Sequence, residues 1–106
     1  VTNKFVFNKG QRRNVTPISS GATYAVLATD DYIAITTLAA AFQINLPSTP
    51  TTGDAYEFKD TVGSANTFNV TINGNGANVD GAATVVLSQA YASIIVTYTG
   101  TQWSIS

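Results

Sequence analysis

The chain contains 106 residues and carries a formal net charge of −1, with 44% hydrophobic but only 10% charged residues. This length predicts a single domain with its own core, and the small net charge gives no field that would attract nucleic acid or an anionic membrane. The absence of Cys and His excludes disulfides and nearly excludes transition-metal sites. No run approaches the roughly 20 apolar residues of a spanning helix, so we expect no membrane insertion, no nucleic acid partner and no cofactor.

The first 20 residues differ from the rest of the chain in charge. Lys4, Lys9, Arg12 and Arg13 lie there, whereas only one further cation follows. Pro17 lacks a backbone donor and disfavours helix at the residue before it. We therefore interpret residues 1–20 as an extended arm or linker and residues 21–106 as one β domain. Because the chain begins at Val1 and not at Met, we expect a fragment or a trimmed product.

Residues 23–28 and 31–36 predict two strands joined by a tight turn at residues 29–31, which is a hairpin pattern. Residues 37–41 favour helix but are too few to form one alone, so we expect a connector. Strict alternation at residues 42–46 predicts a strand, which the two prolines and the glycine of loop 47–53 end. Residues 54–60 alternate as well, with Tyr56 and Phe58 inward and Glu57 and Lys59 outward.

The clearest strand of the chain follows the loop at residues 61–66. Phe68, Val70 and Ile72 alternate with polar residues, and the Asn- and Gly-rich segment 73–81 then predicts a reversal, because both residue types tolerate positive φ. Further strands are expected at 84–88, 91–98 and 101–106, the last two joined by a two-residue turn at Thr99 and Gly100.

The eight or nine short strands predict an all-β fold, an antiparallel β-sandwich resembling a jelly roll. Strands do not alternate with helical stretches, so a parallel α/β fold is not expected. No faithful internal repeat is visible, which disfavours a solenoid.

Nothing in the sequence forms a catalytic motif, and we expect no enzyme. Segment 73–80 has the oxygen ligands that calcium prefers, but it carries a single carboxylate, Asp80, so we favour a plain turn. The acid pairs Asp30 with Asp31 and Glu57 with Asp60 lack a catalytic partner. Some of the aromatic side chains are alternatives for stacking on sugar rings, although aromatics that alternate in strands more often belong to a core. They are Tyr24, Tyr32, Tyr56, Tyr91, Tyr98 and Trp103.

Several runs of the sequence, in order, resemble a small β domain of bacteriophage and prophage tail-fibre, tail-needle and tailspike-type proteins, often near the C-terminus. They are YAVLATDDYIAIT (24–36), INLP (44–47), PTTGD (50–54), FKD (58–60), NVTINGNG (69–76), DG (80–81) and GTQWSI (100–105). The chain departs from that family at residues 77–79, which are Ala-Asn-Val where the family often has a Lys-Thr-Ile-like triplet.

The resemblance implies a homotrimeric virion appendage domain that acts outside the cell, joined to the rest of the phage fibre or tail. We expect loops 47–53, 61–66 and 73–81 to contact a bacterial cell-surface glycan or protein. Two alternatives remain: a structural module that caps or trimerises a fibre without a receptor, and a small glycan hydrolase. The candidate contact residues are Ser48, Thr49, Thr51, Asn66, Asn73, Asn75, Asn78 and Asp80.

Overall fold

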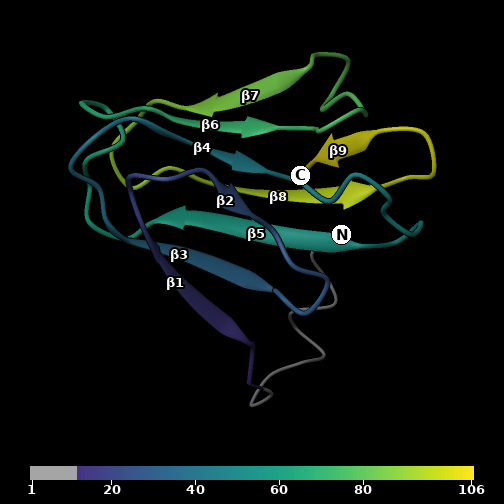
Figure 1. Ribbon diagram of the computed structural model, residues 1–106, viewed down its shortest axis with the longest axis horizontal. Helices are drawn as coiled ribbons and strands as arrows, with labels where there is room; N and C mark the ends of the chain where they lie inside the picture. The colour runs from purple at the N-terminus through teal and green to yellow at the C-terminus, as the bar shows by residue number, and fades with distance from the viewer. Residues whose placement is uncertain (1–11) are drawn as a thin grey trace.

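The computed structural model describes residues 12–106, and this part of the chain forms nine strands and no helix. The strands make two sheets, with the order β1-β3-β5-β8-β9 in one and β2-β4-β6-β7 in the other (Figure 1). The strands are β1 (Val15–Ser19), β2 (Tyr24–Ala25), β3 (Tyr32–Thr37), β4 (Phe42–Asn45), β5 (Ala55–Asp60), β6 (Val70–Asn73), β7 (Thr84–Leu87), β8 (Ser93–Tyr98) and β9 (Trp103–Ile105). The predicted all-β fold is confirmed.

The first six strands wind between the two sheets. Odd-numbered strands lie in one sheet and even-numbered strands in the other, and the pairs β1–β3, β3–β5, β2–β4 and β4–β6 are all parallel. Only β5–β8, β6–β7 and β8–β9 are antiparallel. The prediction of an antiparallel sandwich is therefore wrong for the first six strands, and a jelly roll, which is built of antiparallel strands, does not describe this winding.

The first six strands wind in coils although no repeat is visible in the sequence. The coils have unequal lengths, since the register pairs Val15 with Tyr32 and then Tyr32 with Glu57. A coil of variable length leaves no fixed period in the sequence, so the absence of a repeat did not exclude this arrangement.

The predicted hairpin of residues 23–28 and 31–36 does not form, because β2 and β3 belong to different sheets. The buried side chain of Asp30 explains the crossing. It accepts hydrogen bonds from the Tyr24 hydroxyl at 2.6 Å and the Leu27 N–H at 2.9 Å, both before the turn, and from the Thr16 hydroxyl at 2.8 Å. These bonds hold segment 26–31 as a bridge between the sheets.

The predicted arm is partly incorporated into the domain. Residues 1–11 lie outside the described residues, but β1 pairs with β3 and buries Ile18. Pro17 is tolerated because β1 is an edge strand, where a missing N–H breaks no central ladder. Arg13 anchors the start of this strand through ion pairs with Asp31, at 3.0 Å, and with Glu57.

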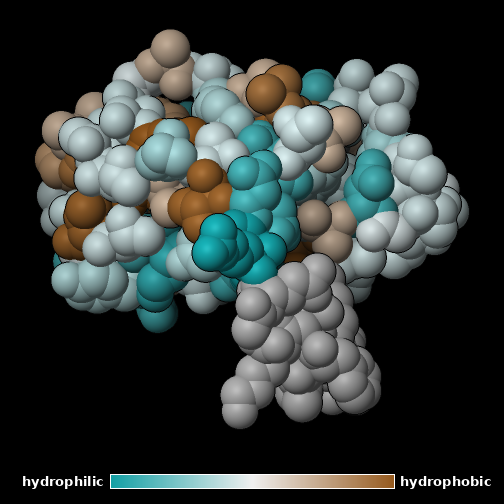
Figure 2. Space-filling model, turned by 90° about the horizontal axis from the view of Figure 1, so that it is seen from below, coloured by the Kyte–Doolittle hydropathy of each residue, from teal (hydrophilic) through white to brown (hydrophobic). Residues whose placement is uncertain are grey.

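The core lies between the sheets. Ile33, Ile44, Phe58 and Ile72 each have no exposed surface, and burial alternates along β5 as the sequence predicts, with Tyr56 and Phe58 inside. Trp103 is also fully buried, with its ring centroid 5.9 Å from that of Tyr56. Seen from the β1 side in Figure 2, the hydrophobic residues at the surface form small separate groups among polar ones.

The segment 78–82 closes one side of the core between the two sheets. It follows β6 of one sheet and contacts β9 of the other, where Trp103 N–H donates to the Asn78 carbonyl at 2.8 Å and Asp80 N–H donates to the Trp103 carbonyl at 2.9 Å. Within residues 12–106, β1 and β2 have no comparable cover and each pairs on one side only.

Candidate functional site: a hollow at one end of the two sheets

Strand directions sort the loops into two groups at the two ends of the molecule. Loops 26–31, 46–54, 74–83 and 99–102 follow β2, β4, β6 and β8 and gather at one end, on the right of Figure 1. We call this the hollow end. Loops 20–23, 38–41, 61–69 and 88–92 follow β1, β3, β5 and β7 and gather at the other, which we call the opposite end.

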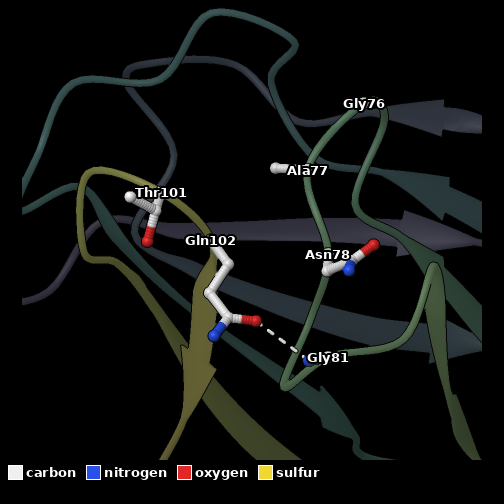
Figure 3. Close-up of a pocket in the computed structure, with 6 residues that line it drawn as sticks. All are labelled: Gly76, Ala77, Asn78, Gly81, Thr101 and Gln102. Carbon is white, nitrogen blue, oxygen red and sulfur yellow. Dashed lines mark hydrogen bonds between the residues drawn. The ribbon is translucent and has the colours of Figure 1, made fainter.

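The hollow end carries a shallow, open hollow of about 460 Å³. Figure 3 shows that loop 74–83 and loop 99–102 face each other across it, with the Ala77 methyl directed towards Thr101. The Gln102 side chain links the two loops by accepting a hydrogen bond from Gly81 N–H at 2.9 Å. The hollow is lined by Gly76, Ala77, Asn78, Gly81, Thr101 and Gln102.

The sequence of loop 74–83 explains why it holds this shape. Asn75 and Asp80 adopt positive φ, 56° and 46°, which Asn and Asp tolerate better than other side chains. Gly74 is required for a different reason: a Cβ there would lie 1.8 Å from the Ala77 carbonyl oxygen. These features hold the loop in one conformation.

Three of the predicted contact residues use their side chains to build this end. Asn73 Oδ1 accepts from Asn75 N–H at 2.7 Å, Asn75 Nδ2 donates to the Leu46 carbonyl at 3.0 Å, and Asp80 Oδ1 accepts from Ile105 N–H at 3.0 Å. These bonds favour the plain-turn interpretation of segment 73–80 over a calcium loop, because the same oxygens and amides are engaged by the protein. Of the four predicted residues in this segment, only Asn78 lines the hollow.

Loop 46–54 lies beside the hollow and carries Ser48, Thr49 and Thr51, all exposed. The loop is braced at its base, where Asp54 Oδ2 accepts from Thr51 N–H at 2.9 Å and Gly53 N–H donates to the Tyr98 carbonyl at 2.8 Å. These three hydroxyl residues therefore share the hollow end with Asn78.

Asn66 lies apart from the other predicted contacts. It is exposed in loop 61–69, which follows β5 and so belongs to the opposite end. The structure thus brings loops 47–53 and 73–81 together but leaves loop 61–66 at the far end of the sheets. This division could not be predicted from the sequence, because it depends on strand direction.

Sequence reasoning missed Thr101 and Gln102, which it placed inside the last strand. That strand begins only at Trp103, and the connection is a loop of four residues closed by Thr99 N–H donating to the Gln102 carbonyl at 2.9 Å. Gly100 marked the turn correctly, and its φ of 107° is a glycine conformation.

Of the four carboxylates considered for catalysis, Asp30, Asp31 and Asp60 accept backbone hydrogen bonds, and Glu57 forms an ion pair with Arg13. Asp60, on β5, is fully buried and accepts from four backbone N–H groups, those of Val62, Gly63, Ala65 and Tyr91. Burial opposes its ionisation, but these hydrogen bonds outweigh burial and hold the pKa of Asp60 below its usual value.

Asp30 contributes to a raised pKa of the neighbouring Tyr24. Burial, together with the hydrogen bond and the charge of Asp30, raises the pKa of the Tyr24 phenol above its ordinary value. Within residues 12–106, no three His, Cys, Asp or Glu side chains lie close enough to hold a metal ion. No helix in this described part could span a membrane.

The chain was compared with protein-family models and with curated proteins, and neither comparison found a match.

Proposed function

We propose that this chain is a homotrimeric domain of a bacteriophage appendage, a tail fibre, needle or spike, that attaches to a glycan or protein on the bacterial surface. The observation that carries the proposal is the hollow between loops 74–83 and 99–102, with the exposed hydroxyl residues of loop 46–54 at the same end of the sheets. The composition of these loops supports it further, because they offer Asn, Gln, Ser and Thr side chains and few charges.

The chemistry of the hollow end suits a hydroxyl-rich ligand. Asn78, Thr101 and Gln102 supply amide and hydroxyl groups that donate and accept hydrogen bonds. Loops braced by backbone hydrogen bonds lose little conformational entropy when a ligand is bound. A shallow site gives a weak single contact, and a trimer would compensate because three linked sites raise the effective concentration.

The test is attachment of the fluorescently labelled 106-residue chain to a panel of bacterial strains. The double variant Asn78→Ala/Thr101→Ala should reduce attachment at least about tenfold, since it removes two polar contacts. Asn69→Ala is the matched control, because Asn69 is exposed outside the hollow, and it should bind as the wild type does. Attachment that survives the double variant, or a monomer mass by light scattering at micromolar concentration, would contradict the proposal.

The structural alternative, a module that caps a fibre, is favoured by a different observation. One side of the winding is covered by segment 78–82, whereas β1 and β2 pair on one side only within the described residues. A capping module would retain assembly and would show no strain-dependent attachment in the same experiment.

A further inference from the structure

Tyr91 combines exposure with an unusual backbone conformation. It lies at the opposite end, in loop 88–92, and 57% of it is exposed. Its φ of 62° is in the left-handed region, which a bulky side chain adopts only when the surrounding structure imposes it. Strained backbone conformations of this kind cluster at functional sites, so Tyr91 is a candidate for a binding contact.

Three contacts impose this conformation. The Tyr91 N–H donates to the buried carboxylate of Asp60 at 3.1 Å, and the ammonium of Lys59 donates to the Tyr91 carbonyl. The ring lies against Gly63, where a Cβ would be 2.6 Å from the ring atoms Cε2 and Cζ. These contacts hold both the backbone and the ring, although more than half of the residue remains exposed.

Lys59 places its charge over one face of the Tyr91 ring. Its Nζ lies 5.6 Å from the ring centroid, within the range of a cation–π contact. An ammonium has three donors, and its bond to the Tyr91 carbonyl uses one of them. The site thus offers an aromatic surface and hydrogen-bond donors within a few ångströms.

From this geometry we propose that Tyr91 and Lys59 form a sugar-binding platform, in which a pyranose ring stacks on Tyr91 and a hydroxyl or carboxylate of the same sugar accepts from Lys59. A sugar ring has one apolar face of C–H groups and a rim of hydroxyls, which matches a rigid aromatic surface with an ammonium donor close to it. A fixed ring also loses little entropy on binding.

The surroundings favour a sugar over a protein partner. Of the exposed large hydrophobic residues, Val62 lies in loop 61–69 next to Gly63. Val15, Leu27 and Val86 lie outside loops 61–69 and 88–92. A stable protein interface needs about 800 Å² on each partner with an apolar centre. The residues around Tyr91 in loops 61–69 and 88–92 are instead mostly polar and include Ser64, Asn66 and Gln89.

The inference rests on the proposed attachment function, to which it adds a second glycan contact at the other end of the sheets. It is tested without cells, so the two can fail separately. The probes are the methyl pyranosides of glucose, galactose, mannose, rhamnose and N-acetylglucosamine, added to the full 106-residue chain and followed by saturation-transfer NMR.

We expect saturation transfer to the ring protons of at least one sugar. Tyr91→Asn keeps the left-handed backbone, which Asn tolerates, but removes the ring, so it should weaken binding at least about tenfold. Tyr91→Phe keeps the ring and should bind within about threefold of the wild type. Val86→Ala, which trims an exposed side chain of β7, is the control and should change nothing.

A second measurement covers the case in which Tyr91→Asn does not fold. In the wild type, sugar should shift the ring resonances of Tyr91 and leave those of Tyr32 unchanged. The proposal is overturned if no sugar gives saturation transfer, if Tyr91→Asn binds as the wild type does, or if the Tyr91 resonances stay in place. Loss of cell attachment in Tyr91→Asn without any sugar binding would also overturn it and would indicate a protein partner.

Discussion

The side-chain carboxylate of Asp60 accepts a hydrogen bond from the backbone N–H of Tyr91 at 3.1 Å, although 31 positions separate the two residues. The same carboxylate accepts from Val62, Gly63 and Ala65 at 2.9–3.0 Å. One buried charge therefore joins the loop after β5 to the loop before β8, and the conformation of Tyr91 depends on it.

Replacing Asp60 by Asn should destabilise the fold by about 3 kcal/mol or more, because the amide has one acceptor oxygen and leaves buried N–H groups unpaired. The free energy of unfolding in urea measures the effect. Asp31→Asn is the control, since this partly exposed residue pairs with Arg13 at the surface and its loss should cost under about 1 kcal/mol. Equal effects for the two variants would show that Asp60 does not hold the loops.

Stability should also fall in acid because of Asp60. Its folded pKa is lowered, so its contribution is complete above the unfolded pKa of about 3.9 and is lost as pH falls through the folded pKa. The difference in unfolding free energy between wild type and Asp60→Asn should therefore shrink between about pH 5 and pH 2. Urea titrations at several pH values test this, and a constant difference would contradict it.

The contribution of Tyr24 to stability should instead be lost at alkaline pH. Burial and the bond to Asp30 raise its folded pKa, so its contribution is complete below the unfolded pKa of about 10 and is lost as pH rises above that value. Tyr24→Phe should cost about 1–2 kcal/mol at pH 7, and the gap to the wild type should narrow above about pH 10. A gap that widens in alkali would show that the hydroxyl is not held as described.

Two glycines of loop 74–83 should respond differently to Ala. At Gly74 the new Cβ would lie 1.8 Å from the Ala77 carbonyl oxygen, so we expect rearrangement of the loop and a loss of about 3 kcal/mol or more. At Gly76 the Cβ meets nothing within 4 Å, and only the φ of 107° opposes it, at about 1–2 kcal/mol. Thermal unfolding of both variants gives the comparison, and similar losses would mean that Gly74 is not crowded.

Two substitutions test whether β1 is part of the folded domain or a separate arm. Ile18→Ala should destabilise by about 2–4 kcal/mol, because Ile18 is 7% exposed and lies against the core. Val15→Ala, on the same strand but 54% exposed, should cost about 0.5 kcal/mol or less. If Ile18→Ala were as mild as Val15→Ala, residues 15–19 would not be part of the folded domain.

Alternation made several strands predictable. The pattern at residues 42–46, 54–60 and 68–72 gives the correct inward residues, since a period of two depends only on which face is buried. The same period arises in parallel and antiparallel sheets, so it could not reveal that β4 and β6 run in the same direction. The direction of pairing had to come from the structure.

Hydrogen bonds between side chains far apart in the sequence could not be predicted either. Asp30 could be placed in a turn, but its bond to Thr16 and its bridging of two sheets follow from the fold. Asn78, which lines the hollow, was among the predicted contact residues, and its role as a contact stays a prediction. Gln102 was missed because the sequence suggested a two-residue turn where the structure has a loop of four.

The parallel winding has a consequence for how the chain folds during its synthesis. A parallel pair cannot close until the intervening crossover is complete, so β1 emerges without its neighbour and waits for β3. Within residues 12–106, the only pairs between consecutive strands are β6–β7 and β8–β9, both in the second half of this sequence. We expect a nascent chain to stay largely open until these hairpins leave the ribosome, with folding slower than in a meander of equal length.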